Sequence, residues 1–119
     1  MARILIIEDN EHNLYLQTFI LQKNGHEVIQ ASSGESGIAR AAQELPDLIL
    51  LDIQLPGMDG YAVAEALRKN PAIVSIPIIA VTSYAMTGDR ERILASGCTG
   101  YIEKPIDPDS FPTEVSQFL

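Results

Sequence analysis

The sequence LILLDIQLPGMDG, residues 48–60, contains a strand that decides the fold and an aspartate at the end of that strand. Its first part, Leu48 to Asp52, is apolar without alternation, as is typical of a strand covered by helices on both faces. The Pro, Gly and Asp residues that follow are typical of a loop. We therefore predict a buried parallel strand that places the carboxylate of Asp52 at one edge of a sheet.

Other apolar runs of the chain also end in polar residues. These polar residues are Glu8 and Asp9 after residues 4–7, Thr82 after residues 78–81, and Lys104 after the short run at 101–102. Parallel strands bring their carboxyl ends to one edge, and open α/β sheets bind ligands at that edge. The pattern predicts a site that combines carboxylates, a hydroxyl and a lysine.

Strand and helix signals alternate five times along the chain, which is typical of an α/β domain with a parallel core. A second, weaker strand is expected at 28–31. Four helix starts are expected: Asn10, Asp59 and Thr87 as caps, and a Ser-x-x-Glu capping box at residues 32–35. The expected helix ends are Gly25, Pro46, Asn70-Pro71 and Gly97.

Two helices have core-facing residues that can be assigned from spacing. In the first helix, Leu16, Phe19 and Ile20 are the expected buried residues. In the last helix, Phe111, Val115 and Phe118 recur at helical spacing. That helix has at most about ten residues and needs to pack against the sheet to be stable.

Size and charge restrict the class of protein. A chain of 119 residues is predicted to form one domain, residues 1–119. Its net charge of −8 would repel nucleic-acid phosphates, so we expect no direct nucleic-acid partner. No apolar stretch reaches the ~18 residues of a membrane span. The single Cys98, expected as a small helix-end residue, agrees with a reducing compartment, and we expect a cytoplasmic protein without membrane contact.

The polar residues at the strand ends suit phosphoryl transfer. An aspartate can attack phosphorus and form an acyl phosphate. Because both reactants are negative, a divalent cation such as Mg²⁺ or Mn²⁺ has to lie between them, and Mg²⁺ prefers oxygen ligands. Glu8 and Asp9 can hold the cation next to Asp52, Lys104 can contact a phosphoryl oxygen, and Thr82 can supply a hydroxyl.

In these residues the chain resembles the receiver domain of two-component response regulators. The resemblance rests on Glu8-Asp9, the run at 52–60, Thr82 and Lys104-Pro105, in that order along the chain. It implies a doubly wound α/β fold, with a five-stranded parallel sheet in the order 2-1-3-4-5 and five helices. The chain would be a stand-alone regulator or the receiver module of a larger regulator or hybrid kinase.

The resemblance also implies a role for each site residue. Asp52 would accept a phosphoryl group from a histidine kinase or a histidine phosphotransfer protein. The metal ligands would be Asp9, Asp52, Glu8 (largely through water) and the backbone carbonyl of Gln54. Lys104 would contact the phosphoryl group, and its bond to Pro105 would be cis.

A conformational change is implied as well. Thr82 and Tyr101 would form a switch pair that alters the face made by the fourth helix, fifth strand and fifth helix. That face would bind a downstream protein target, with the chain as a monomer or a phosphorylation-dependent dimer. Gln54 and Tyr84 occupy positions that flank the phosphoryl group in this family. A bulky Tyr84 would shield that group from water and slow its hydrolysis.

Two alternative functions have requirements that can be compared with the sequence. A phosphatase or phosphotransferase with an aspartyl-phosphate intermediate needs a second carboxylate two residues after the nucleophile, and residue 54 is Gln. A nucleotide- or flavin-binding domain needs a glycine-rich loop after the first strand, where residues 8–11 are Glu-Asp-Asn-Glu. Both are disfavoured. A receiver-like regulator without enzymatic turnover of a substrate is the preferred interpretation.

Overall fold

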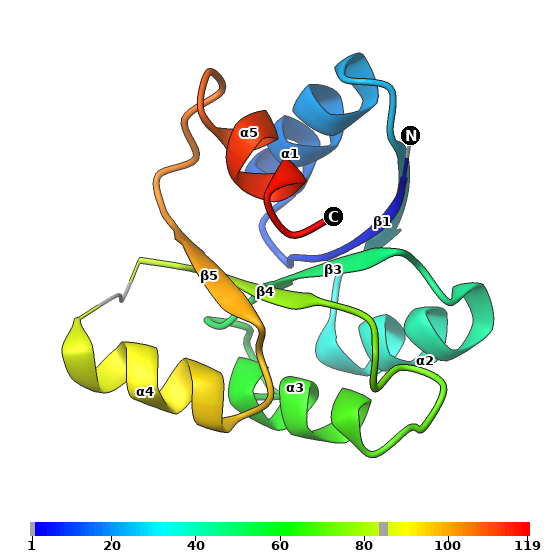
Figure 1. The fold of residues 1–119 in the computed structure, drawn as a ribbon, viewed down its shortest axis with the longest axis vertical. Coiled ribbons are helices and arrows are strands. Elements are labelled where there is room, and N and C mark those ends of the chain that lie inside the picture. The colour runs from blue at the N-terminus through cyan, green and yellow to red at the C-terminus, as the bar shows by residue number, and fades with distance from the viewer. Residues whose placement is uncertain (1, 84–85) are drawn as a thin grey trace.

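The computed structural model describes residues 2–83 and 86–119, which form a parallel sheet between two layers of helices (Figure 1). In chain order the elements are β1 (Arg3–Ile7), α1 (Glu11–Lys23), β2 (Glu27–Ala31), α2 (Gly34–Glu44), β3 (Leu48–Asp52), α3 (Gly60–Arg68), β4 (Ile78–Thr82), α4 (Thr87–Ala95), β5 (Gly100–Glu103) and α5 (Phe111–Ser116). The five strands pair in the order β2-β1-β3-β4-β5, all parallel. The predicted fold and strand order are confirmed.

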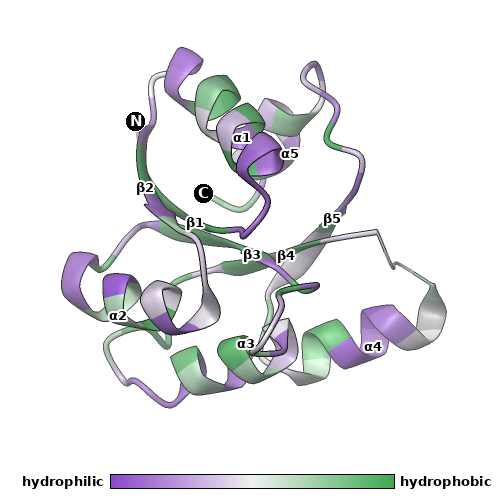
Figure 2. Ribbon diagram, turned by 180° about the vertical axis from the view of Figure 1, so that it is seen from behind, coloured by the Kyte–Doolittle hydropathy of each residue, from purple (hydrophilic) through white to green (hydrophobic). Residues whose placement is uncertain are grey.

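Each face of the sheet is covered by its own set of helices. Helices α1 and α5 lie on one face, and α2, α3 and α4 lie on the other (Figure 1). Alternate residues of each strand enter different layers: Leu5 and Ile7 pack towards α2 and α3, while Ile4 and Ile6 pack towards α1. The central strands are hydrophobic along their length for this reason (Figure 2).

Some of the predicted helix caps are confirmed. The side chain of Asn10 accepts a hydrogen bond from the Asn13 N–H, and that of Asp59 accepts one from the Tyr61 N–H. Gly97 adopts a positive φ of 109° after α4, as expected of a C-terminal glycine. These local signals come from adjacent residues, which is why the sequence was sufficient to find them.

Other helix starts differ from the prediction. The capping box of α2 is formed by Ser33 and Ser36, one residue later than expected. Each serine hydroxyl accepts a hydrogen bond from the backbone N–H of the other serine. Helix α4 begins at Thr87, so this residue lies inside the helix. Its cap is Met86, whose backbone N–H donates to the carboxylate of Asp89 at 3.3 Å.

The buried side of α1 was partly mispredicted. Phe19 is 52% exposed and stacks on the exposed ring of Tyr15, with 6.2 Å between ring centroids. The buried residues of this helix are Gln17, Ile20 and Leu21, which share one face at a spacing of three to four residues. Burial of the polar Gln17 turns Phe19 to the opposite side of the helix. In α5, the helix ends at Ser116, before Phe118.

The single cysteine lies where it was expected, after the glycine that ends α4. Cys98 is buried, and burial raises the pKa of its thiol.

No helix among the described residues combines the length and hydrophobicity that crossing a bilayer requires.

Gly60, the first residue of α3, allows the backbone after β3 to fold back closely. Its N–H donates to the carbonyl of Ile53 at 3.2 Å. A Cβ placed on Gly60 would lie 2.4 Å from the Ile53 Cα and 2.7 Å from the Ile53 oxygen. Because both atoms belong to the backbone, they cannot move aside as a side chain can. This contact fixes the loop that follows Asp52.

We predict that Gly60→Ala lowers the free energy of unfolding by about 3 kcal/mol, because the methyl group overpacks against backbone. Urea unfolding followed by circular dichroism measures the change. Gly88→Ala is the matched control, since it lies in the first turn of α4 with no atom within 4 Å of the added Cβ. That substitution should raise stability by about 0.5 kcal/mol. Equal effects of the two substitutions would contradict the close approach at Gly60.

Candidate functional site

The ends of β1 and β3 bring two carboxylates together. Ile7 is the register partner of Leu51, and Glu8 and Asp52 each follow one residue later. Oxygen atoms of Glu8, Asp9 and Asp52 all lie within 4.8 Å of one another. In this strand order the chain leaves β1 in one direction and β3 in the other, so the cluster lies at the topological switch point, where open sheets bind ligands.

Strand alternation explains why neighbouring acidic residues differ in exposure. Glu8 continues the series Ile4, Ile6 on the face covered by α1, and only 1% of it is exposed. Asp9 leaves the strand and is exposed to solvent. The site therefore has a buried carboxylate in Glu8, a second one in Asp52 and an accessible one in Asp9.

Lys104 supplies the positive charge next to this cluster. Its Nζ lies 3.2 Å from Asp52 Oδ1 and 3.4 Å from Glu8 Oε1, and its side chain is 15% exposed. The backbone N–H of Lys104 donates to the Thr82 carbonyl at 2.8 Å, which joins the residue to the end of β4. The peptide bond between Lys104 and Pro105 is cis, as the resemblance implied.

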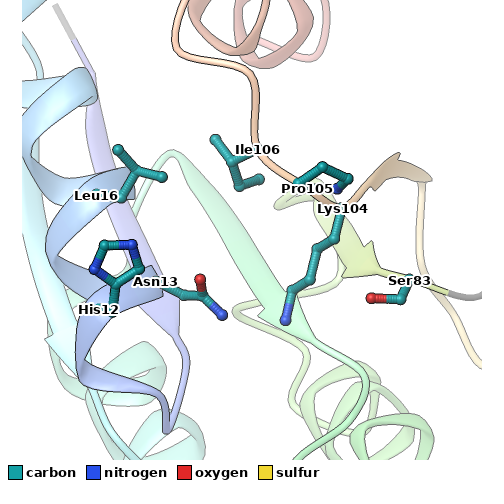
Figure 3. A pocket seen from close by; sticks show the side chains of 7 residues that line it. All are labelled: His12, Asn13, Leu16, Ser83, Lys104, Pro105 and Ile106. Atoms are coloured by element: carbon teal, nitrogen blue, oxygen red, sulfur yellow. The ribbon is translucent and has the colours of Figure 1, made fainter.

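A cavity of about 370 Å³ opens beside Lys104. Its lining comes from α1, from the end of β4 and from the segment after β5, namely His12, Asn13, Leu16, Ser83, Lys104, Pro105 and Ile106 (Figure 3). The side chain of Lys104 lies along this cavity (Figure 3). The cavity therefore lies between α1 and the segment that carries Lys104.

Crowding of the carboxylates changes the titration of Glu8. The pKa of Glu8 is raised to about 7, mainly by burial and also by the contact with Asp52 and its charge, while Lys104 and the Asn10 N–H partly oppose these effects. A cation would remove the repulsion that raises this pKa. The three groups are all oxygen donors, which fit a hard divalent cation. These residues could therefore hold a metal ion.

Thr82 and Tyr101 lie on the other face of the sheet from Glu8. Thr82 follows Ile78 and Ala80 in the alternation of β4, and Tyr101 is the register partner of Ala80. Thr82 is fully buried and Tyr101 is half-buried. The structure thus brings both members of the predicted switch pair to one face. Their role as a switch pair stays a prediction.

Helix α4 contacts Tyr101 through Arg90. The guanidinium carbon of Arg90 lies 5.4 Å from the centroid of the Tyr101 ring, a cation–π distance. The same guanidinium lies 3.9 Å from the carboxylate of Glu103, also on β5. Arg90 therefore links α4 to the strand that precedes Lys104.

Gln54 forms hydrogen bonds to residues at the ends of two strands. Its backbone N–H donates to Asp52 Oδ1 at 2.9 Å, and its side-chain oxygen accepts from the Ser83 N–H at 3.3 Å. The loop after β3 and the end of β4 are held together in this way. The metal-binding role of its carbonyl stays a prediction, and Tyr84 lies outside the described residues.

Sequence reasoning missed Gln17. This residue is 1% exposed, and its Nε2 lies 3.4 Å from Glu8 Oε1. A signal was present, because Gln17 lies three and four residues before the apolar Ile20 and Leu21 and so shares their face. A polar residue at a core-facing position next to an acidic site indicates a specific contact.

Residues 4–116 match a family model described as the response regulator receiver domain. The chain belongs to this family. As a receiver domain it is 41% identical over 116 residues to the polar-differentiation response regulator DivK of Brucella ovis, covering 98% of this chain and 94% of that protein. A second relative, DivK of Brucella anthropi, is 40% identical over the same length.

Solved structures agree with this membership. The chemotaxis protein CheY4 of Vibrio cholerae has a TM-score of 0.95 at 27% identity, covering 100% of this receiver domain and 99% of that chain. The receiver domain of the sensor histidine kinase PA1611 of Pseudomonas aeruginosa has a TM-score of 0.90 at 31% identity, covering 98% and 96%. That structure is described with a magnesium ion coordinated in its active site cleft. The present chain is thus homologous to two-component response regulators, and its acidic cluster is consistent with a phosphorylation site.

We predict that Asp52→Asn lowers the pKa of Glu8 from about 7 in metal-free protein, because Asp52 raises it through direct contact and charge. A carbon-13 NMR titration of the side-chain carboxyls measures it. In the wild type, folded Glu8 keeps its proton to higher pH than an ordinary glutamate, whose pKa is about 4.5, so its contribution to the free energy of unfolding declines as pH rises from 4.5 to about 7. Asp52→Asn should narrow the pH range over which this contribution is lost. Asp109→Asn, at an exposed aspartate, is the control, and an unchanged Glu8 titration in Asp52→Asn would contradict the coupling.

Proposed function

We propose that residues 1–119 act as one receiver domain that takes a phosphoryl group onto Asp52 and reports it to a protein partner. Receiver domains interact with histidine kinases and downstream targets. The observation that supports the proposal most is the placement of Asp52. It is buried at the switch point of the sheet, 3.2 Å from Lys104 and within reach of two further carboxylates.

The proposed transfer starts from a phosphorylated histidine of a kinase or phosphotransfer protein. A carboxylate oxygen of Asp52 forms a bond to phosphorus, and the bond between phosphorus and the imidazole nitrogen breaks. The electron pair of the broken bond stays on that nitrogen. The products are an acyl phosphate on Asp52 and a free histidine.

Charge has to be neutralised for the two anions to meet. Mg²⁺, held by Asp9, Asp52, the Gln54 carbonyl and Glu8 through water, would supply this neutralisation when bound. Lys104 already lies against Asp52 and would move its hydrogen bond to a phosphoryl oxygen. The Thr82 hydroxyl would contact another phosphoryl oxygen. Lys104, which would bind the product, therefore lies beside Asp52 before the transfer.

Transmission of the signal would involve the face made by α4, β5 and α5. Thr82 and Tyr101 share one side of the sheet, and Arg90 joins Tyr101 to α4. Movement of the Thr82 hydroxyl towards the phosphoryl group would leave space for the Tyr101 ring to turn inward. The Arg90 contact would then be broken or remade. Phosphorylation would thus shift an equilibrium between two arrangements of this surface.

A phosphatase with an aspartyl-phosphate intermediate is the competing function. It needs an acid–base group beside the nucleophile, and the Gln54 amide cannot exchange a proton in that role. The Gln54 side chain is also engaged with the Ser83 N–H. Steady hydrolysis of p-nitrophenyl phosphate by the wild type, lost in Asp52→Asn, would favour the phosphatase over the proposed regulator.

We predict that incubation with acetyl phosphate and Mg²⁺ adds one phosphoryl group, measured by intact mass, because Asp52 lies beside Lys104 and next to carboxylates that can hold the cation. Asp52→Asn should abolish the addition, and removal of the cation with EDTA should prevent it. Asp109→Asn, at an exposed aspartate, is the control and should be phosphorylated like the wild type. Folded wild-type protein that gains no mass with Mg²⁺ present would refute the proposed function.

A further inference from the structure

Gln17 is a buried amide within the apolar face of α1. It is 1% exposed and shares its side of the helix with Ile20 and Leu21, which are 5% and 0% exposed. Its Nε2 lies 3.4 Å from Glu8 Oε1. The helix that covers the Glu8 face of the sheet therefore reaches the acidic site through one polar side chain.

The carboxylate of Glu8 is held by three donors. Oε1 faces Nε2 of Gln17 and Nζ of Lys104, both at 3.4 Å, and Oε2 accepts from the Asn10 N–H at 3.4 Å. The amide presents its nitrogen to Glu8, which suits the ionised form of this carboxylate that binds a cation. Each contact is long, but together they restrict the carboxylate from three directions.

The oxygen of the Gln17 amide lowers the stability of the fold. Its Oε1 is buried and has no hydrogen-bond partner among residues 2–83 and 86–119. An unsatisfied buried acceptor destabilises a protein by about 1–3 kcal/mol. An apolar side chain of similar shape would pack beside Ile20 and Leu21 without this penalty. Stability therefore gives no reason for an amide here, whereas the contact with Glu8 does.

We propose that Gln17 is a positioning residue that orients Glu8 and thereby raises the affinity of the acidic site for Mg²⁺. The proposal rests on the proposed function, because it assumes that Glu8 belongs to the metal site. Without the amide, Lys104 would be the only side-chain donor to Glu8 Oε1 among the described contacts. The ion pair between Glu8 and Lys104 would then become shorter. Glu8 would move away from the cation, and Lys104 would move away from Asp52.

The test replaces Gln17 by Met, which fills a similar volume and has no N–H donor. Gln22→Met is the matched control, since Gln22 lies on the same helix and is exposed. Calorimetric titration with Mg²⁺ should show about tenfold weaker binding for Gln17→Met than for the wild type, the usual effect of losing a residue that orients a metal ligand. Gln22→Met should bind Mg²⁺ like the wild type.

Two further measurements separate positioning from a structural role. In EDTA, the free energy of unfolding of Gln17→Met in urea should equal or exceed that of the wild type, because the unsatisfied oxygen is gone. Phosphorylation by acetyl phosphate should be slower at low Mg²⁺ and should match the wild type at saturating Mg²⁺. A structural role would instead lower stability in EDTA and leave Mg²⁺ affinity unchanged.

Either unchanged Mg²⁺ affinity or lower stability in EDTA would overturn the proposal. Gln17→Leu provides the same comparison if the methionine variant does not fold. Failure of the proposed function has a different signature, since wild-type protein would then take up no phosphoryl group at any Mg²⁺ concentration. Direct titration with Mg²⁺ still measures the effect of Gln17 in that case.

Discussion

Mutual repulsion of carboxylates at the ends of β1 and β3 is the constraint on which the site depends. Oxygen atoms of Glu8, Asp9 and Asp52 lie within 4.8 Å of one another, and two of these residues are buried. Such an arrangement persists only if rigid elements hold it. The strands provide this rigidity, because Ile7 and Leu51 just before the site are fully buried and paired in register. Lys104 and a raised pKa of Glu8 offset part of the repulsion, and a cation would offset the rest.

The predicted switch pair, Thr82 and Tyr101, lies on the other face of the sheet from the carboxylates of Glu8 and Asp52. Asp52 pairs with Val81, which packs on the side of α1 and α5, as does Ile6 before Glu8. Thr82 and Tyr101 belong to the opposite side, where α4 packs. An event at the edge of the sheet can therefore reach both layers, because consecutive residues of one strand point to different faces. The hydrogen bond from the Lys104 N–H to the Thr82 carbonyl joins the two sides at the edge itself.

Much of this arrangement follows from the sequence alone. An uninterrupted apolar run such as residues 48–51 needs cover on both faces, which leaves few folds, and the polar residue after each run marks the binding edge. The predictions that were wrong concern two details: which of two neighbouring serines caps a helix, and which side of a helix faces the core. Ser32 and Ser33 are equally good caps, and only the backbone decides between them. Phe19 was assigned to the core because it is apolar and shares helical spacing with Leu16 and Ile20, but a helix has one buried face and Gln17 occupies part of it.

The exposure of Phe19 is explained by the composition of the core beneath α1. Hydrophobicity predicts the rotation of a helix only if the core is purely apolar, and the core beneath α1 contains the carboxylate of Glu8. The helix above Glu8 presents the Gln17 amide to this carboxylate, in agreement with the proposed positioning role, and leaves the aromatic ring of Phe19 in solvent. The exposed ring and the unsatisfied amide oxygen are thus two consequences of this arrangement. Both features are unfavourable for stability, and both occur where α1 meets the acidic cluster. Unfavourable local features of this kind are expected at functional sites.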